Sequence, residues 1–311
     1  MALKNLARFV PRVLSSVLSL LFLLCLIFFA SPHKAWAEAK NFKIVSLAPS
    51  NTELIYSLGG EDKLYGVSSF CHVSKPVVGS FISASYEKLA VIKPDVILLV
   101  QGQEALAFQL RHRHYNVEIL PNEKIQDISD NLKKIGRLLD LQNDAIALSK
   151  RFDTQIDSLK QITKTSTLCK TLVCVWAEPI ICVGKKSFIN DLITACGGIN
   201  VLSAKNLGYS RISHETLLSS RPNLIILPNE AMGSNSIKKL PWTRLCHRPG
   251  VTTFYLPKNR ADFLSRPSLQ VVDGLAWLAT KQHPKEKLRI NQWLDATKLI
   301  LFKKNIKLKS G

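Results

Sequence analysis

An internal repeat constrains the fold more than any other feature of this sequence. Residues 87–99 read EKLAVIKPDVILL and residues 215–227 read ETLLSSRPNLIIL, a shift of 128 positions. Each copy starts with a glutamate, continues through an apolar-rich helical stretch to a basic residue and a proline, and ends in an apolar run typical of a buried strand. A helix–Pro–strand unit that occurs twice predicts two lobes built on the same plan.

A second repeated unit supports this prediction. KIVSLAPSNTELIYSLGG (residues 43–60) has the pattern of a short strand, a turn and a helix that ends at two glycines. We expect Ser50, Asn51 or Thr52 to cap this helix, with Glu53 in its first turn. Alternating strands and helices of this kind favour an α/β fold with parallel sheets.

The matching unit of the second lobe contains an insertion. TLVCVWAEP (residues 171–179) lies the same 128 positions beyond KIVSLAPSN, but the glycine-ended helix that follows it, SFINDLITACGG, lies 138 positions beyond its counterpart. We predict that the extra residues, around PIICVGKKSF, form a small hairpin. Within each lobe a ligand should approach the carboxyl ends of the strands, as it does in open α/β sheets.

One amphipathic helix is predicted between the lobes. Apolar residues recur at three- and four-residue spacing through residues 141–164, and neither glycine nor proline interrupts them. A helix of this length spans roughly 35 Å. We therefore expect a rigid connection, with little closure of the lobes on a ligand. The predicted organisation is residues 1–37 as signal peptide, 38–140 as N-terminal lobe, 141–164 as connecting helix and 165–311 as C-terminal lobe.

Residues 1–37 have the three parts of a secretory signal peptide. MALKNLARFVPR carries three positive charges and no acid, eighteen uncharged residues follow, and AWA (Ala35–Ala37) places small residues at the −3 and −1 positions of a cleavage site. Alternatively the leader remains as an anchor, because eighteen uncharged residues nearly span a bilayer. We predict cleavage after Ala37 and a periplasmic protein, with membrane tethering as the alternative.

The remaining chain is basic. Without the four basic residues of the leader, 38 Lys and Arg and 23 Asp and Glu remain, a net charge of +15. Such a charge suits an anionic membrane surface, an acidic ligand or nucleic acid, or it is a solvated basic surface. We exclude nucleic acid, because the chain is exported and has neither a basic–aromatic stripe nor zinc-finger spacing.

Six cysteines follow the leader: Cys71, Cys169, Cys174, Cys182, Cys196 and Cys246. An oxidising compartment allows some of them to pair. Six cysteines have fifteen full connectivities, however, and the sequence favours none of them. No CxxC pair occurs, so neither a thioredoxin-type site nor a structural zinc site is indicated.

Together, the leader, IVSLAPSNTELIYSLGG, YGVSSFC, VGSFISASYEKLAVIKPDVILL, the connecting helix, ACGGIN and ISHETLLSSRPNLIIL resemble the helical-backbone (class III) substrate-binding proteins of ABC importers. The resemblance covers nearly all of the chain after the leader. The nearest pattern is that of the vitamin B12-binding proteins, through VSLAPSNTELIYSLGG and GVSSF. It implies two Rossmann-like lobes joined by one long rigid helix, with a ligand cleft between them.

The resemblance also implies ligand contacts. Phe70 in SSFCH, Phe81 in GSFIS, Tyr209 in LGYSR and Asp262 in ADFLSRPS match positions of the family's site. The strand-end rule adds Trp176, which ends the LVCVW strand. A corrin ring or chelate is broad and largely apolar, so aromatic faces suit it. The alternative for each aromatic residue is ordinary core packing.

Two further residues adjoin this predicted site. Cys71 and His72 follow Phe70, and we include them as ligand-binding candidates because imidazole and thiolate can approach the metal of a chelate. The alternative is a polar loop, and we assign no metal site of the protein itself. The chain departs from the vitamin B12-binding pattern at Phe81, where that pattern has tryptophan, and near Val100, where it has another aromatic residue.

The repeated glutamates have a separate implied role. Glu87 and Glu215 each start a helix, where the helix dipole favours a carboxylate, and this placement alone would explain them. The resemblance implies that they dock on arginines of the importer's permease dimer in the inner membrane. We expect a monomer without a cofactor, whose ligand is cobalamin, with a ferric siderophore or haem as the alternative.

Two other function classes are alternatives to a binding protein. An α/β enzyme acting on a tetrapyrrole or chelate is the main rival, but the sequence has no GxGxxG loop, P-loop or GxSxG elbow, and Glu178 is its best-placed carboxylate. A structural or adhesive module is the third class, and the predicted cleft aromatics argue against it. The sequence therefore favours a binding protein without catalytic residues.

Overall fold

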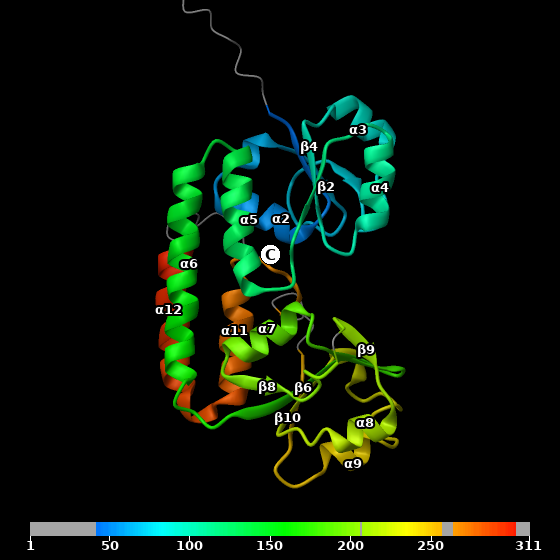
Figure 1. Cartoon of the computed structure of the whole chain (residues 1–311), viewed down its shortest axis with the longest axis vertical. Coiled ribbons are helices and arrows are strands. Elements are labelled where there is room, and N and C mark those ends of the chain that lie inside the picture. The colour runs from blue at the N-terminus through cyan, green and yellow to red at the C-terminus, as the bar shows by residue number, and fades with distance from the viewer. Residues whose placement is uncertain (1–41, 206, 257–263, 303–311) are drawn as a thin grey trace, which may run out of the picture. The chain divides into compact units, whose positions relative to one another are not determined.

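The computed structural model of the chain describes residues 42–205, 207–256 and 264–302 (Figure 1). The predicted signal peptide and Asp262 lie outside these residues, so the predictions made for them stay predictions. None of the described helices combines the length and the hydropathy needed to cross a membrane.

The N-terminal lobe contains one parallel sheet with the strand order β3-β2-β1-β4-β5. Its strands are β1 (Ile44–Ser46), β2 (Leu64–Ser68), β3 (Val77–Gly79), β4 (Val96–Val100) and β5 (Val117–Leu120). Its helices are α2 (Pro49–Ser57), α3 (Tyr86–Ile92), α4 (Glu104–His112) and α5 (Ile125–Leu138), with a 3-10 turn at Glu61–Lys63. Because all five strands are parallel, their carboxyl ends share one edge of the sheet.

The C-terminal lobe contains a mixed sheet with the order β11-β10-β6-β7-β9, and β8 pairs with the start of β6. Its strands are β6 (Cys169–Ala177), β7 (Ile180–Val183), β8 (Gly198–Asn200), β9 (Tyr209–Arg211), β10 (Leu224–Leu227) and β11 (Thr252–Tyr255). Its helices are α7 (Phe188–Ala195), α8 (His214–Ser219), α9 (Trp242–Cys246), α11 (Val271–Gln282) and α12 (Lys287–Phe302), with 3-10 turns at Asn229–Ala231 and Pro284–Glu286.

The inserted segment was predicted to form a small hairpin by itself, but it supplies only β7, which forms an antiparallel hairpin with β6 of the repeated unit. A disulfide joins Cys174 to the directly opposite Cys182. Cys71, Cys169, Cys196 and Cys246 are free. The insertion therefore adds an antiparallel extension to the second lobe, whose strands β10 and β11 remain parallel to β6.

The repeated helix–Pro–strand unit has the same local structure in both lobes. Ser85 caps α3 by accepting a hydrogen bond from the backbone N–H three residues ahead, and Ser213 caps α8 in the same way. Lys93 and Arg221, the residues before the two prolines, both have left-handed φ values, 52° and 45°. This shared backbone turns the chain from each helix into the next strand.

The first strand of the repeat is shifted by one residue from its predicted alignment. Ile44 lies opposite Val96 in the first lobe, and Thr171 lies opposite Leu224 in the second. Val96 and Leu224 are 128 positions apart, but Ile44 and Thr171 are only 127 apart, so the offset of 128 was wrong for this strand. Side chains alternate between the two faces of a strand, so an error of one residue assigns every side chain to the wrong face. The offset of 127 aligns residues that face the same side of the sheet in both lobes.

The predicted cap of α2 was also wrong. The N-cap residue is Ala48, and it makes no side-chain capping bond. Pro49 follows, and because proline has no N–H, the need for a cap at this position is smaller. The buried side chains of Asn51 and Thr52 bond elsewhere: Asn51 donates to the Leu99 carbonyl at 3.0 Å, and Thr52 donates to the Ser46 hydroxyl at 2.9 Å.

The predicted connecting helix is α6 (Gln142–Thr163), and α5 and α12 pack along it (Figure 1). The apolar face of α6 belongs to one buried cluster that also contains residues from the sheets of both lobes. Its α6 members are Leu148, Phe152, Ile156 and Leu159. On α12, the Trp293 indole donates to the Gln155 carbonyl of α6 at 2.8 Å. The connecting helix is therefore the centre of a helical layer shared by both lobes.

Each sheet has a second face with a core of its own. In the N-terminal lobe this core includes Val45, Ile97 and Leu110, under α3 and α4. In the C-terminal lobe it includes Ile225 and Trp242, under α8 and α9. Each sheet thus lies between the shared helical layer and a pair of helices that belongs to its lobe alone.

Because the apolar face of α6 is part of the shared core, substitutions on that face should lower the free energy of unfolding. Phe152 of α6 is fully buried, so Phe152→Ala should lower the free energy of unfolding by about 3–5 kcal/mol. Ile146→Ala on the exposed side of the same helix, where the side chain is 55% exposed, should change it by less than about 0.5 kcal/mol. Urea unfolding of the chain from Glu38 measures both values. Similar values for the two variants would contradict the role given to the α6 face.

Candidate functional site: an aromatic cleft between two lobes

In the N-terminal lobe, two predicted aromatic residues occupy loops at the carboxyl edge of the sheet. Phe70 follows β2 and is 54% exposed, and Phe81 follows β3 and is 38% exposed. These exposed fractions rule out ordinary core packing for both rings. Val100, by contrast, is buried, so the chain offers no side chain to a ligand at that position.

Gln103 holds the Phe81 loop in place, and sequence reasoning missed it. Its buried side-chain amide donates to the Phe81 carbonyl at 2.8 Å and to the Leu47 carbonyl at 3.2 Å. Its side-chain oxygen accepts from the Val100 N–H at 2.9 Å. Three segments of the carboxyl edge are thus tied to one side chain, and the backbone next to Phe81 is fixed before any ligand arrives.

In the C-terminal lobe, Trp176 and Tyr209 lie on strands β6 and β9, one on either side of β7. They are 54% and 51% exposed, respectively. The Trp176 indole N–H donates to the Glu178 carbonyl at 2.6 Å, which orients the ring. Desolvation raises the pKa of the Tyr209 hydroxyl above its ordinary value, so this group is a neutral donor at physiological pH.

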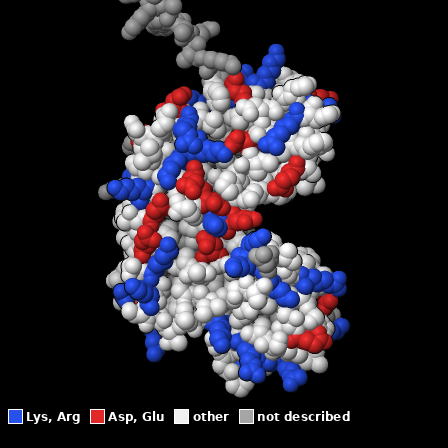
Figure 2. All heavy atoms as spheres, in the orientation of Figure 1, with Lys and Arg blue, Asp and Glu red and all other residues white. Residues whose placement is uncertain are grey.

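Each lobe therefore contributes two exposed aromatic rings. Among the described residues one pair of rings is stacked, Phe108 with His112, and it includes none of these four. Figure 2 shows the surface hollowed on its right side, between the N-terminal lobe above and the C-terminal lobe below. Ligands of open α/β sheets bind at the carboxyl ends of the strands, so we expect the rings to line this hollow. Their position as ligand contacts stays a prediction.

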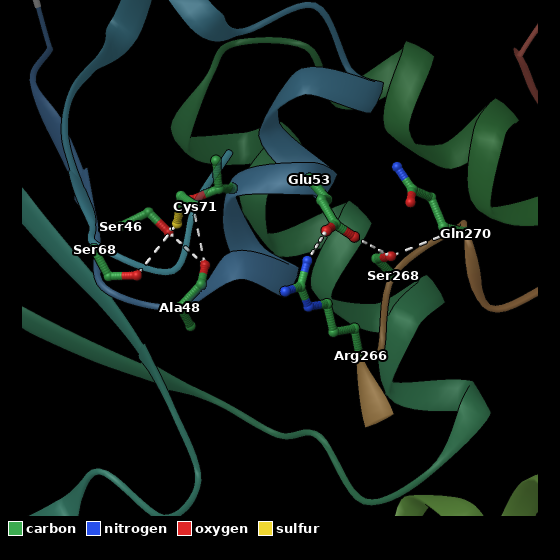
Figure 3. Close-up of polar contacts among 9 residues, drawn as sticks. Ser46, Ala48, Glu53, Ser68, Cys71, Arg266, Ser268 and Gln270 are labelled. Carbon is green, nitrogen blue, oxygen red and sulfur yellow. Dashed lines mark hydrogen bonds and ion pairs between the residues drawn. The ribbon is translucent and has the colours of Figure 1, made fainter. Parts of the chain in front are cut away.

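Cys71 is directed toward the N-terminal lobe itself. Its Sγ lies 3.3 Å from the hydroxyls of both Thr52 and Ser68, and the side chain packs against the core shared by the lobes (Figure 3). His72, the next residue, is exposed. Of this pair, His72 is the side chain with free access to a bound ligand. No group of three His, Cys, Asp or Glu residues within the described ranges is arranged to hold a metal ion.

A carboxylate in the middle of α2 joins the two lobes. Glu53 forms an ion pair with Arg266, whose Nη1 lies 3.2 Å from Oε1, and it also accepts a hydrogen bond from the Ser268 hydroxyl (Figure 3). Gln270 N–H in turn donates to Ser268 Oγ at 3.3 Å. Glu53 belongs to the first lobe, and its partners precede α11 of the second. The prediction that Glu53 lies in the first turn of this helix was wrong, because α2 begins at Pro49 and its first turn contains no acidic residue. Sequence reasoning also missed these partners.

A second polar contact joins the lobes at the start of α5. The Ile125 N–H donates to Asp191 of α7 at 2.7 Å. A carboxylate at this position satisfies one of the unpaired N–H groups of α5 and interacts favourably with the helix dipole. With the shared core, these two contacts hold the lobes at a fixed separation.

The repeated glutamates are exposed in the first turns of their helices, Glu87 in α3 and Glu215 in α8. Figure 1 shows α3 and α8 on the same side of the view, one in each lobe. A hydrogen bond with the Ser213 hydroxyl lowers the pKa of Glu215. Both positions are therefore accessible to a partner, and Glu215 keeps its charge to a lower pH than an ordinary glutamate.

Two surface cavities lie elsewhere, along α6. One is lined by residues of α2, α6 and α12, among them Ser57 and Thr154. The other is lined by residues of α5, α6 and α7, among them Asp153 and Asp191. Neither contains a predicted ligand-binding residue. Both are open grooves beside the helical layer, and they lack the aromatic rings that a broad apolar ligand requires.

Comparison with known proteins places this arrangement in a family. The vitamin B12-binding protein of Vibrio vulnificus is 23% identical over 233 residues, which cover 73% of this chain and 84% of that protein. Among solved structures, the periplasmic vitamin B12 binding protein BtuF of Vibrio cholerae has a TM-score of 0.65 at 20% identity, covering 82% of this chain and 97% of that one.

Other solved structures share the fold. An ABC transporter substrate-binding protein of Listeria monocytogenes has a TM-score of 0.71 at 21% identity, covering 79% of this chain and all of that one. The periplasmic heme binding protein HutB of Vibrio cholerae has a TM-score of 0.63 at 18% identity, covering 80% and 99%. The model of the family described as "Periplasmic binding protein" matches residues 44–240, well over half of the sequence. The chain belongs to the periplasmic binding protein family.

Proposed function

We propose that the chain is exported to the periplasm, binds one large metal chelate between its lobes and delivers it to the permease dimer of an ABC importer. A corrinoid such as cobalamin is the proposed ligand. The observation that carries the proposal is the exposure of two aromatic rings on each lobe at loops and strands of the sheet edges, Phe70 and Phe81 on one and Trp176 and Tyr209 on the other. Family membership itself establishes a binding protein rather than an enzyme.

The exposed aromatic faces support a broad, largely apolar ligand. Exposed aromatic rings cost free energy in water, and a broad apolar ligand removes their faces from it without demanding many polar partners. The relatives named as vitamin B12-binding proteins match over most of their length, which favours a corrinoid over other chelates. The protein needs no cofactor of its own for this role.

A second ligand class has its own support. Phe81 is smaller than the tryptophan of the vitamin B12-binding pattern, and the buried Val100 adds no aromatic face. His72 is exposed beside the cleft loop, and a neutral imidazole binds haem iron. Several structural neighbours are named as heme-binding proteins. Haem or a ferric siderophore is therefore the alternative ligand.

The ligand proposal is tested by titration. Cyanocobalamin added to the chain from Glu38 should bind at one site, measured by calorimetry and by absorbance, with haem and a ferric siderophore as parallel ligands. Phe81→Ala combined with Tyr209→Ala should weaken binding about ten- to a hundredfold, because one apolar face is lost from each lobe.

Phe108→Ala is the matched control, because this ring is 70% exposed on α4 and is not among the predicted contacts. It should leave affinity unchanged. Absence of heat and of spectral change up to ~0.1 mM cyanocobalamin would reject the corrinoid. Equal affinity of the double variant and the control would reject the aromatic site.

Delivery is assigned to the repeated glutamates. They are exposed, they occupy equivalent positions in the two lobes, and their charge is favoured by the helix N-termini on which they lie. The two subunits of a permease dimer can offer one arginine each. Charge-assisted pairs between arginine and carboxylate fix orientation as well as affinity.

Glu87→Ala with Glu215→Ala should lower the affinity for the permease by about tenfold or more and reduce uptake, while ligand affinity stays unchanged. Binding to the reconstituted transporter and uptake by cells measure the two effects. Because the pKa of Glu215 is lowered, its carboxylate stays charged down to a lower pH than an ordinary glutamate. Its contribution to permease binding should therefore be present at neutral pH and be lost only as the pH falls through that lowered pKa.

Glu123→Ala with Glu230→Ala is the control for this prediction. It removes one exposed carboxylate from each lobe at positions outside the repeat. The control should bind the permease like the unmodified chain. If the Glu87 and Glu215 variant also transports normally, the two glutamates only stabilise their helices.

A further inference from the structure

The two repeated halves differ sharply in charge. Residues 83–123 of the first lobe contain four Lys and Arg and five Asp and Glu, a net charge of −1. The equivalent residues 211–251 contain six Lys and Arg and two Asp and Glu, a net charge of +4. Both segments build the same helix–Pro–strand unit and the helix beyond it. The fold therefore does not require the positive charge of the second copy.

Much of this charge is gathered around the start of α9. Lys238, Lys239 and Arg244 are exposed there, and Leu240 next to Lys239 exposes 68% of its side chain. Met232, in the loop that leads to this helix, exposes 63%. We call these five residues the basic surface. Figure 2 shows Lys and Arg gathered over the lower part of the C-terminal lobe, around the position of α8 and α9.

The basic surface is presented by a firmly anchored segment. Trp242, the first residue of α9, is buried, and its indole N–H donates to the Ala177 carbonyl of β6 at 3.1 Å. Leu245 is buried one turn later. Because these two side chains hold α9 against the sheet, the neighbouring lysines and Leu240 remain on the outside.

The basic side chains of the basic surface, Lys238, Lys239 and Arg244, form no ion pair with another described residue. Three positive charges without an ion-pair partner among the described residues, together with two exposed apolar side chains, form a surface whose natural complement is anionic and has an apolar layer beneath its charges.

We propose that the basic surface binds the anionic phospholipid headgroups of a membrane. Lys and Arg are attracted to an anionic bilayer, and apolar side chains next to them enter the boundary between headgroups and acyl chains. A nucleic acid fits this surface poorly, since Trp242, the first residue of α9, is buried and cannot stack on a base. An acidic protein would be attracted by the charges but would gain less from Leu240 and Met232.

This contact would orient the protein on the membrane through its C-terminal lobe. Helices α8 and α9 pack against each other, so the basic surface lies next to the helix that carries Glu215. The corresponding half of the N-terminal lobe has no excess of positive charge. The inference does not depend on the ligand or on the permease, because bare vesicles test it.

The test is sedimentation with lipid vesicles. The chain from Glu38, which retains the whole compact unit that begins at Phe42, should bind vesicles made of equal parts of phosphatidylglycerol and phosphatidylcholine. It should bind pure phosphatidylcholine weakly, and high salt should release it. Each basic residue near the surface contributes about fivefold to binding, so Lys238→Gln with Lys239→Gln and Arg244→Gln should weaken binding about 100-fold.

Two further variants separate the contributions. Leu240→Ser with Met232→Ser should weaken binding to anionic vesicles without changing net charge. Lys150→Gln with Lys164→Gln and Lys287→Gln removes the same charge from exposed positions at or next to α6 and α12, and it should bind nearly like the unmodified chain. Circular dichroism verifies that each variant is folded.

Three results would overturn the proposal. The first is no binding to anionic vesicles at low salt. The second is an equal loss in the basic-surface variant and the charge-matched control, which would show an effect of net charge alone. The third is binding to soluble polyglutamate as tight as binding to vesicles, together with no effect of Leu240→Ser and Met232→Ser, which would indicate an acidic protein partner.

Discussion

Helix α6 packs against both lobes through one apolar face, and this packing determines how the two sheets are positioned. Phe152 and its neighbours on the apolar face of this helix belong to the same buried cluster as strands of both sheets. A hinge requires a segment that can change its backbone angles without exposing apolar surface. Movement of the lobes about α6 would expose this core and break the Glu53–Arg266 and Asp191–Ile125 contacts. The cleft is therefore essentially preformed.

With the lobes held at one separation, the proposed ligand contacts are side chains at the carboxyl edges of the two sheets. The helical layer and the two sheets determine the spacing of the lobes, whereas Phe81 and Tyr209 lie on a loop and on the short strand β9, outside the shared core. Such positions can change without loss of stability. Under the proposed function, substitutions at such positions would change the ligand while the shared core keeps the fold.

The α/β class, the duplicated plan and the connecting helix were predictable because each follows from a local pattern of apolar spacing or from the repeat. The predicted hairpin was only partly right, because one of its two strands is β6 of the repeated unit. The cap of α2 was wrong because Asn51 and Thr52 bond to neighbouring strand ends. The inter-lobe contact of Glu53 with Arg266 was missed because 213 positions separate them. Gln103 carries no motif that would mark it. For the site, the sequence identified residues that are exposed in the structure, but Cys71 is turned inward by hydroxyl partners that its own loop does not predict.

A distance measured between the lobes shows whether the helical layer holds them at one separation. Spin labels at Val91 on α3 and at Met232 in the C-terminal lobe occupy exposed positions on opposite lobes, in a chain whose free cysteines are replaced by serine. Pulsed electron–electron resonance would be recorded with and without cyanocobalamin or haem, whichever binds. If the helical layer is rigid, a single narrow distance distribution is expected, with a mean that changes by less than about 2 Å on ligand binding. A broad distribution in the free protein, or a clear shortening on binding, would contradict this rigidity.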